Sequence, residues 1–229
     1  RTMGINERPP LALLDALQRQ FDLSMPRQPG YNTVECIQAM LAGQVKVFIG
    51  LGGNFAQATP DTPRTQQALR NCALTVQIST KLNRSHLTMG RDALILPCLG
   101  RTDIDMQATG SQFVTVEDSM SMVHASRGFI KPPSDSVMSE PWIVARIAKA
   151  TLCGKGGVDW DAFAADYDLI RDKIEAVFPD FHDFNDRIRK PGGFHLPNSA
   201  SQRIWKTDTG KANFMVSPRL HEDEVTTDP

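Results

Sequence analysis

Residues 45–54 read Val-Lys-Val-Phe-Ile-Gly-Leu-Gly-Gly-Asn, a β-branched and aromatic run that leads directly into a glycine-rich loop. Such a run has the composition of a buried strand. In an open parallel sheet, ligands bind beyond the carboxyl ends of the strands, and glycines there let backbone N–H groups approach a phosphate closely. The spacing is Gly-x-Gly-Gly-Asn and differs from the Gly-x-Gly-x-x-Gly of the usual dinucleotide-binding turn. The loop is therefore interpreted either as a phosphate-binding site or as a tight turn.

Helix and strand signals alternate around this stretch. Apolar residues at helical spacing predict helices over residues 11–21, 32–43 and 62–69. Strand-like runs at residues 74–78 and 93–96 follow the one that starts at Val45. Strands separated by helices of this length are joined by crossover connections, which produce a parallel sheet. We therefore predict an α/β fold with a mostly parallel sheet and helices on both of its faces.

The rest of the chain predicts irregular hairpins followed by helices. Gly, Thr, Asp and Ser interrupt residues 98–135, which indicates an excursion of short strands. Helical spacing then predicts helices that begin after Ser139, after Asp159 and at Pro179, and the periodicity is lost from Lys190 onward. We expect an α/β domain over residues 1–155, a helical extension of the same domain over 156–190, and an extended connector over 191–229.

Composition and charge exclude several classes of protein. The chain has 229 residues and a formal net charge of −1, whereas nucleic-acid-binding domains are usually strongly basic. A chain of this length can bury about 70% of its unfolded surface, which supports a real core. No apolar run approaches the roughly 18 residues of a membrane span. Because the chain begins at Arg1 with no signal-peptide pattern, we expect it to be an internal piece of a longer protein.

The cysteines and the known catalytic motifs point to no chemistry within this chain. Cys36, Cys72, Cys98 and Cys153 contain no Cys-x-x-Cys pair, so neither a zinc site nor an iron–sulfur ligand set is indicated. Free thiols favour a reducing, cytoplasmic setting. No nucleophile–base motif is present. We predict no catalytic residue and no metal ligand here.

Polar residues gather after the second predicted strand. Residues 79–86 read Ser-Thr-Lys-Leu-Asn-Arg-Ser-His. In a parallel sheet they lie at the same edge as the glycine loop, where they suit hydrogen bonding to a ribose or a base; a solvated loop is the alternative. His86 has no second ligand at metal-binding spacing, and Asp103 and Asp105 are expected to be exposed loop acids.

Several segments, taken in chain order, resemble the molybdopterin-dependent oxidoreductases, the superfamily of formate dehydrogenase, nitrate reductase and dimethyl sulfoxide reductase. The matching segments are residues 1–4, 45–55, 74–97, 139–142 and 209–214. Residues 45–55 resemble the strand–Gly–x–Asn–Pro segment of this superfamily, with Phe55 in place of the usual Pro. The chain is most similar to formate-dehydrogenase-like α subunits, and the resemblance covers nearly all of it up to residue 216.

The resemblance implies a Rossmann-like domain that binds bis-molybdopterin guanine dinucleotide, which carries molybdenum. The residues that it places near the guanosine diphosphate tail are Gly52, Gly53, Asn54, Gln77, Ser79, Thr80 and Glu140. The first three would contact that tail, and residues 77–80 would lie near its ribose or guanine. Relatives carry Asp where this chain has Ile78, so Glu140 or Ser79 would take over guanine recognition.

The resemblance also implies a parent enzyme that performs two-electron oxidoreduction at molybdenum, with formate oxidation as the nearest guess. A [4Fe–4S] cluster would lie in an N-terminal part outside this chain. The implied partners are the remaining domains of the parent chain, a small molecule such as formate, and an electron-transfer subunit, with no nucleic acid. The chain alone is expected to be inactive. Two alternatives stay open: a stand-alone nucleotide-binding or interaction module, and a nicotinamide-dependent dehydrogenase, which the glycine spacing disfavours.

Overall fold

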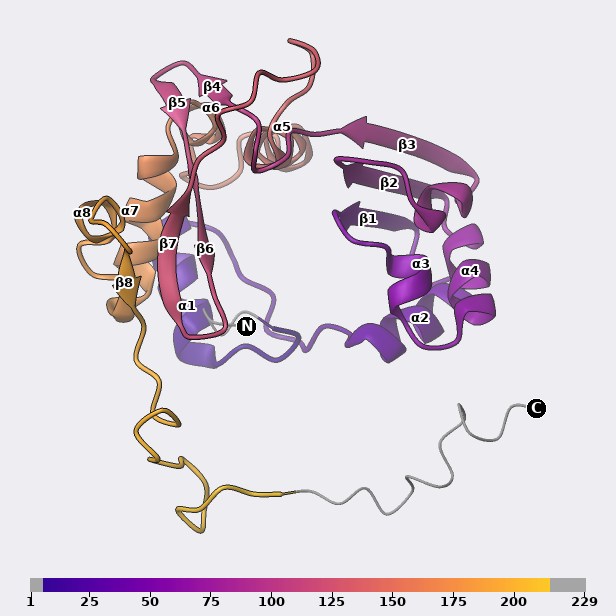
Figure 1. The fold of residues 1–229 in the computed structure, drawn as a ribbon. Helices are drawn as coiled ribbons and strands as arrows, with labels where there is room; N and C mark the ends of the chain where they lie inside the picture. Colours follow the sequence, from indigo (N-terminus) through magenta and orange to yellow (C-terminus); the bar gives the residue numbers. More distant parts are fainter. Residues whose placement is uncertain (1–5, 215–229) are drawn as a thin grey trace.

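The computed structural model describes residues 6–214, so residues 1–4 and the predicted tail end lie outside the described part. The strands form one parallel sheet, β1-β2-β3, and two antiparallel sheets, β4-β5 and β6-β7-β8. Figure 1 shows the parallel sheet with α2, α3 and α4 on one side of the molecule, and the antiparallel strands with α7 and α8 on the other. No helix within residues 6–214 is long and apolar enough to cross a membrane.

The quoted stretch forms the first strand of the parallel sheet. β1 (Val47–Leu51) pairs in parallel with β2 (Leu74–Ser79), which pairs in parallel with β3 (Asp92–Pro97). β1 begins two residues later than the run at Val45 predicts, although the Lys46 carbonyl already accepts from the N–H groups of Ala73 and Leu74 at 2.9 and 3.0 Å. The predicted α/β fold with a parallel sheet is confirmed.

Helices α2 (Thr33–Leu41), α3 (Phe55–Ala58) and α4 (Thr62–Arg70) cover one face of this sheet. α2 starts where the sequence predicts a helix, since Asn32 and Glu35 form a capping box with both hydrogen bonds at 2.9 Å. The core on this face consists of Ile37, Met40, Ala56, Ala68, Leu69 and Cys72, with Phe48 of β1 packed against it. A short 3₁₀ helix, η1 (Arg84–Leu87), lies beside α3.

Helix α5 (Glu140–Leu152) covers the opposite face, so helices lie on both faces as predicted, but this second cover is partial. Ile143 of α5 packs with Val76 and Ile78 of β2. Ile49 and Leu51 are register neighbours of those two residues and therefore share their face, yet they are 49% and 51% exposed. Burial on this face is thus concentrated on β2 under α5, whereas β1 is left half exposed.

The excursion predicted between residues 98 and 135 is a pair of antiparallel hairpins. β4 (Asp105–Gln107) pairs with β5 (Gly110–Gln112), and β6 (Val114–Glu117) pairs with β7 (Met122–Ser126).

One short strand departs from the predicted connector, because β8 (Phe194–His195) pairs with β7. Gly193 allows this approach: its φ is +71°, and a Cβ there would lie 1.9 Å from the Val123 carbonyl oxygen. Residues 196–214 contain turns but no further helix or strand.

The helices after α5 are shorter than predicted. The helix expected after Asp159 is two, α6 (Trp160–Ala165) and α7 (Tyr167–Val177). They separate at Asp166, whose extended backbone ends α6 and whose carboxylate caps α7 by accepting from the Asp168 N–H at 2.9 Å.

The helix predicted from Pro179 to Ile188 is likewise divided. It consists of η2 (Pro179–Phe181) and α8 (Phe184–Ile188), because Asp183 between them has a left-handed backbone with φ of +50°. These helices and β6–β8 enclose an aromatic core of Phe113, Phe181, Phe184 and Phe194, together with Val123, Ile188 and Leu196. Helix α1 (Leu11–Phe21), which the sequence predicts, packs against α7.

Candidate functional site

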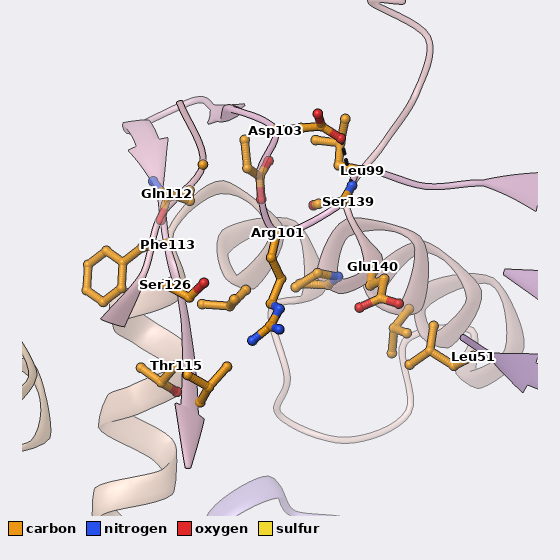
Figure 2. Close-up of a pocket in the computed structure, with 17 residues that line it drawn as sticks. Leu51, Leu99, Arg101, Asp103, Gln112, Phe113, Thr115, Ser126, Ser139 and Glu140 are labelled. Atoms are coloured by element: carbon orange, nitrogen blue, oxygen red, sulfur yellow. Dashed lines mark hydrogen bonds between the residues drawn. The ribbon is translucent and has the colours of Figure 1, made fainter. Parts of the chain in front are cut away.

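A cavity of about 430 Å³ lies at the carboxyl edge of the parallel sheet (Figure 2). Its walls come from the end of β1 at Leu51, the segment after β3, the start of α5, and strands β6 and β7. The volume falls within the range of small-molecule sites, which are about 300–1,000 Å³. Ligands bind at this edge in open α/β sheets, so the cavity is the natural candidate site.

The glycine loop borders this cavity and exposes backbone donors. Gly52 and Gly53 have φ of +64° and +66°, a conformation that favours glycine. The Gly52 N–H extends the ladder by donating to the Ile78 carbonyl at 2.8 Å. Within residues 6–214, no hydrogen bond involves the N–H of Gly53 or Asn54. Two consecutive free N–H groups in such a loop form an arrangement that can bind an anion.

Three side chains hold the loop in place. Asn54 Oδ1 accepts from the Ser85 hydroxyl at 3.1 Å, and Asn54 Nδ2 donates to Gln57 Oε1 at 3.0 Å. Asn83 Nδ2 donates to the Gly53 carbonyl at 2.6 Å. The polar run after β2 therefore meets the glycine loop, as the parallel sheet predicts. The Asn54 side chain is engaged within the protein and positions the loop.

Gln77 lies behind the loop and is buried. A Cβ on Gly50 would come within 2.6 Å of Gln77 Oε1, so a larger residue at position 50 would displace this amide. Gln77 Nε2 and His86 Nε2 are buried and have no hydrogen-bond partner among the described residues. His86 Nδ1 accepts from the Asn83 N–H at 3.0 Å and lies 3.2 Å from Asn83 Oδ1. A buried donor without a partner costs about 1–3 kcal/mol, so the Gln77 amide is a group that a bound ligand could satisfy.

Ser79 and Thr80 take different positions at the end of β2. The Ser79 hydroxyl donates to the Lys81 carbonyl at 2.8 Å and so serves its own loop. Thr80 lies beside the cavity, since its methyl carbon would be 3.9 Å from a Cβ on Gly100, a residue of the cavity wall.

Among the predicted site residues, Glu140 is the most distant in sequence from the glycine loop, yet its side chain lies close to the loop. Its Oε1 lies 3.9 Å from the position of a Cβ on Gly52, and it lines the cavity. Burial, together with the charge of Glu140, raises the pKa of Cys98 to about 11. The Cys98 thiol is therefore protonated near neutral pH. Ile78, in contrast, is 1% exposed and packs under α5, so it faces no ligand.

Asp103 and Asp105 also line the cavity, which corrects the expectation that they are exposed loop acids. Asp103 Oδ2 accepts from the Gly100 N–H at 2.8 Å. Asp105 accepts from the Tyr167 hydroxyl at 2.5 Å, and burial and this carboxylate raise the pKa of Tyr167.

These acids and Arg101 follow β3, whose carboxyl end lies at the same edge as those of β1 and β2. The sequence signal for these residues is their position directly after the third predicted strand, whose carboxyl end lies at the same edge of a parallel sheet. No group of three or more His, Cys, Asp or Glu side chains in the described part of the chain is arranged to hold a metal ion.

Comparison with known proteins shows similarity to oxidoreductases, although no family model matches the chain. The chain is 56% identical over 219 residues to a protein of Mycobacterium tuberculosis (strain ATCC 25618 / H37Rv) that is named an uncharacterized oxidoreductase, covering 95% of this chain and 28% of the relative. It is 49% identical over 223 residues to Protein YdeP of Escherichia coli (strain K12), covering 97% of this chain and 29% of the relative.

A third relative is a nitrate reductase of Klebsiella oxytoca. The chain is 32% identical to it over 127 residues, covering 55% of this chain and 13% of the relative. The chain spans less than a third of the length of each of these three proteins.

Proposed function

We propose that this chain is the part of a molybdenum oxidoreductase that binds the guanosine diphosphate end of a molybdopterin guanine dinucleotide. The observation that carries the proposal is the approach of Glu140 to Gly52 beside the cavity. The free N–H groups of Gly53 and Asn54 suit the oxygens of a diphosphate. The Glu140 carboxylate suits the adjacent N–H donors of guanine, because an ionised carboxylate only accepts hydrogen bonds.

The relatives support the redox part of the proposal. Two of them carry the name oxidoreductase or nitrate reductase. The resemblance noted from the sequence joins nitrate reductase and formate dehydrogenase in one superfamily, so similarity to a nitrate reductase supports a molybdopterin cofactor.

The residues at the sheet edge fit such a group. The space beside Gly53 is open, with no atom within 4 Å of a Cβ placed there, and Gln77 presents a buried donor without a partner in the described structure. When bound, the cofactor supplies the two-electron chemistry, and the protein supplies binding and orientation. Gly53 and Asn54 hold the diphosphate, Glu140 orients the base, and Asn83 and Ser85 fix the loop.

The parent protein that we propose oxidises formate and passes the electrons through a [4Fe–4S] cluster, held outside this chain, to an electron-transfer partner. The chain alone is then expected to show no formate-dependent dye reduction. The second candidate, a nucleotide-binding module without redox activity, uses the same loop and cavity, so metal content separates the two.

The test is to purify the longer polypeptide that contains this chain from cells grown with molybdate, and to measure its molybdenum and the guanine nucleotide released by acid. The proposal predicts about two guanine nucleotides for each molybdenum, because two dinucleotides share one metal in the bis form, and predicts that Glu140→Gln lowers both. Glu7→Gln, an exposed acid far along the chain from α5, is the matched control and leaves them unchanged. A folded protein that releases guanine nucleotide but no molybdenum would favour the second candidate.

A further inference from the structure

Two charged side chains of the cavity have no partner within residues 6–214. Arg101 and Glu140 line it and form no hydrogen bond or ion pair there. The other two acids of the wall are engaged, since Asp103 accepts from Gly100 and Asp105 accepts from Tyr167. Figure 2 shows the Arg101 side chain extending from the segment after β3 into the space between Ser126 and Glu140.

Arg101 is the one cation among the residues that line the cavity. A guanidinium carries several N–H donors in a planar fork and no acceptor, so it matches a pair of adjacent acceptors. Glu140 offers the opposite chemistry, a pair of acceptors that matches adjacent donors. A ligand that satisfies both must present two donors at one edge and two acceptors at another.

Guanine has this pattern. Its O6 and N7 are neighbouring acceptors that arginine commonly binds in a bidentate manner, and its N2 amino group, next to N1–H, is a donor. Adenine presents a donor at position 6 in place of the O6 acceptor, so an arginine there discriminates against it. The apolar wall, which includes Leu51, Leu99 and Val144, suits the faces of a base.

We propose that Arg101 is a specificity residue that binds the O6 and N7 edge of guanine while Glu140 binds the N1 and N2 edge. This inference rests on the proposed function and adds to it a residue that selects the base. The diphosphate is then left to the N–H groups of Gly53 and Asn54, which follow Leu51 of the cavity wall in the glycine loop. Arg101 is exposed and unpaired, so its replacement leaves the fold intact.

The test is isothermal titration calorimetry of the 229-residue chain with three nucleotides: GDP, 7-deaza-GDP and IDP. The second nucleotide lacks N7 of the base, and the third lacks the N2 amino group. We expect Arg101→Ala to weaken GDP binding by about tenfold or more, because one bidentate contact contributes that much discrimination. The variant should also bind GDP and 7-deaza-GDP equally well. Glu140→Gln should instead reduce the preference for GDP over IDP.

Arg91→Ala is the matched control, since Arg91 is an exposed arginine that pairs with Asp92 at the start of β3, and its loss changes the net charge equally. It should leave all three affinities unchanged. The inference is overturned if the Arg101→Ala variant binds GDP with the affinity of the wild type. It is also overturned if the variant binds GDP more weakly but keeps the wild-type preference for GDP over 7-deaza-GDP, because Arg101 then does not bind the base. If the wild-type chain, folded by circular dichroism, binds none of the three, the proposed function itself is contradicted.

Discussion

The antiparallel and parallel regions of this molecule bury their cores in different ways. Around β6–β8, the ring of Phe184 lies 5.0 Å from that of Phe181 and 5.4 Å from that of Phe194, and all three are buried. In the parallel sheet, α2–α4 bury one face, whereas Val47, Ile49 and Leu51 on the other face are about half exposed. The closed aromatic core and the candidate binding groups therefore lie in separate regions.

Because Phe181, Phe184 and Phe194 do not line the cavity, substitutions there can change stability separately from substitutions of Arg101 and Glu140, which do line it. The antiparallel region contributes a buried aromatic core, whose Phe113 also lines the cavity, while the parallel sheet contributes the carboxyl edge at which Leu51 and the start of α5 line it. Substitutions that test the first should alter unfolding, and those that test the second should alter ligand affinity.

The largest effect is expected in the aromatic core. Phe184→Ala removes a ring that is 1% exposed, and should lower the free energy of unfolding by about 3–5 kcal/mol, because such a change leaves a cavity. Phe129→Ala, at an 81% exposed position, is the control and should change it by less than about 0.5 kcal/mol. Urea denaturation followed by circular dichroism measures both. Equal effects of the two would show that the aromatic core is not closed.

Substitutions on the two faces of the parallel sheet should differ in their effect on the free energy of unfolding, by a smaller amount than in the aromatic core. Leu69→Ala, on the face covered by α2–α4, should cost about 3 kcal/mol, since Leu69 is fully buried. Ile49→Ala, on the opposite face, should cost less than about 1 kcal/mol, because much of its side chain is already in contact with water. The same urea titrations compare them. A cost at Ile49 that matches the cost at Leu69 would contradict the described exposure.

An ion-pair cluster in α7 should make the antiparallel region sensitive to acid. Burial opposes ionisation of Asp168, but hydrogen bonds from Arg189 and Arg171 lower its pKa. A carboxyl with a lowered pKa stabilises the fold above its unfolded pKa of about 3.9, and this contribution is lost as the pH falls through the folded value.

Asp168→Asn should therefore cost about 2 kcal/mol at pH 7, less than for a fully buried pair because Asp168 remains partly exposed. The difference from the wild type should shrink as the pH falls below about 4. Denaturation at several pH values tests this. A difference that is the same at pH 7 and in acid would exclude the ion pairs as its cause.

The smallest effect concerns thiol reactivity and leaves stability unchanged. Burial and the charge of Glu140 raise the pKa of Cys98 to about 11, whereas Cys153 is exposed at the end of α5. Iodoacetamide near pH 8 should modify Cys153 and leave Cys98 unmodified, as peptide mass spectrometry would show, because the thiolate is the reactive form. Equal modification of both would mean that α5 does not cover the carboxyl end of β3.

Local signals predicted much of the fold. β2 and β3 lie within one residue of their predicted ends, and the Asn32–Glu35 capping box starts α2 as expected, because these features depend on neighbouring residues. The break at Asp166 and strand β8 were missed. An aspartate can lie within a helix or cap the next one, and β8 depends on the contact of Gly193 with Val123, which is distant in the sequence.

In the candidate site, too, contacts that follow from the strand order were predictable, whereas contacts between distant elements were not. The parallel sheet predicted that the glycine loop would meet the residues after β2, and Asn83 and Ser85 do reach it. The position of Arg101 was not predicted, because only the residues after the first two strands were expected at the carboxyl edge of the sheet. The approach of Glu140 to Gly52 joins residues from separate elements, so it was indicated by a family resemblance and not by local pattern.

The most direct test of the central claim is isothermal titration of the chain with GDP and with ADP. The account predicts that GDP binds with a dissociation constant in the millimolar range or tighter, and that ADP binds at least about tenfold more weakly, because only guanine satisfies both Glu140 and Arg101. A folded chain that binds neither nucleotide, or binds both equally, would contradict it.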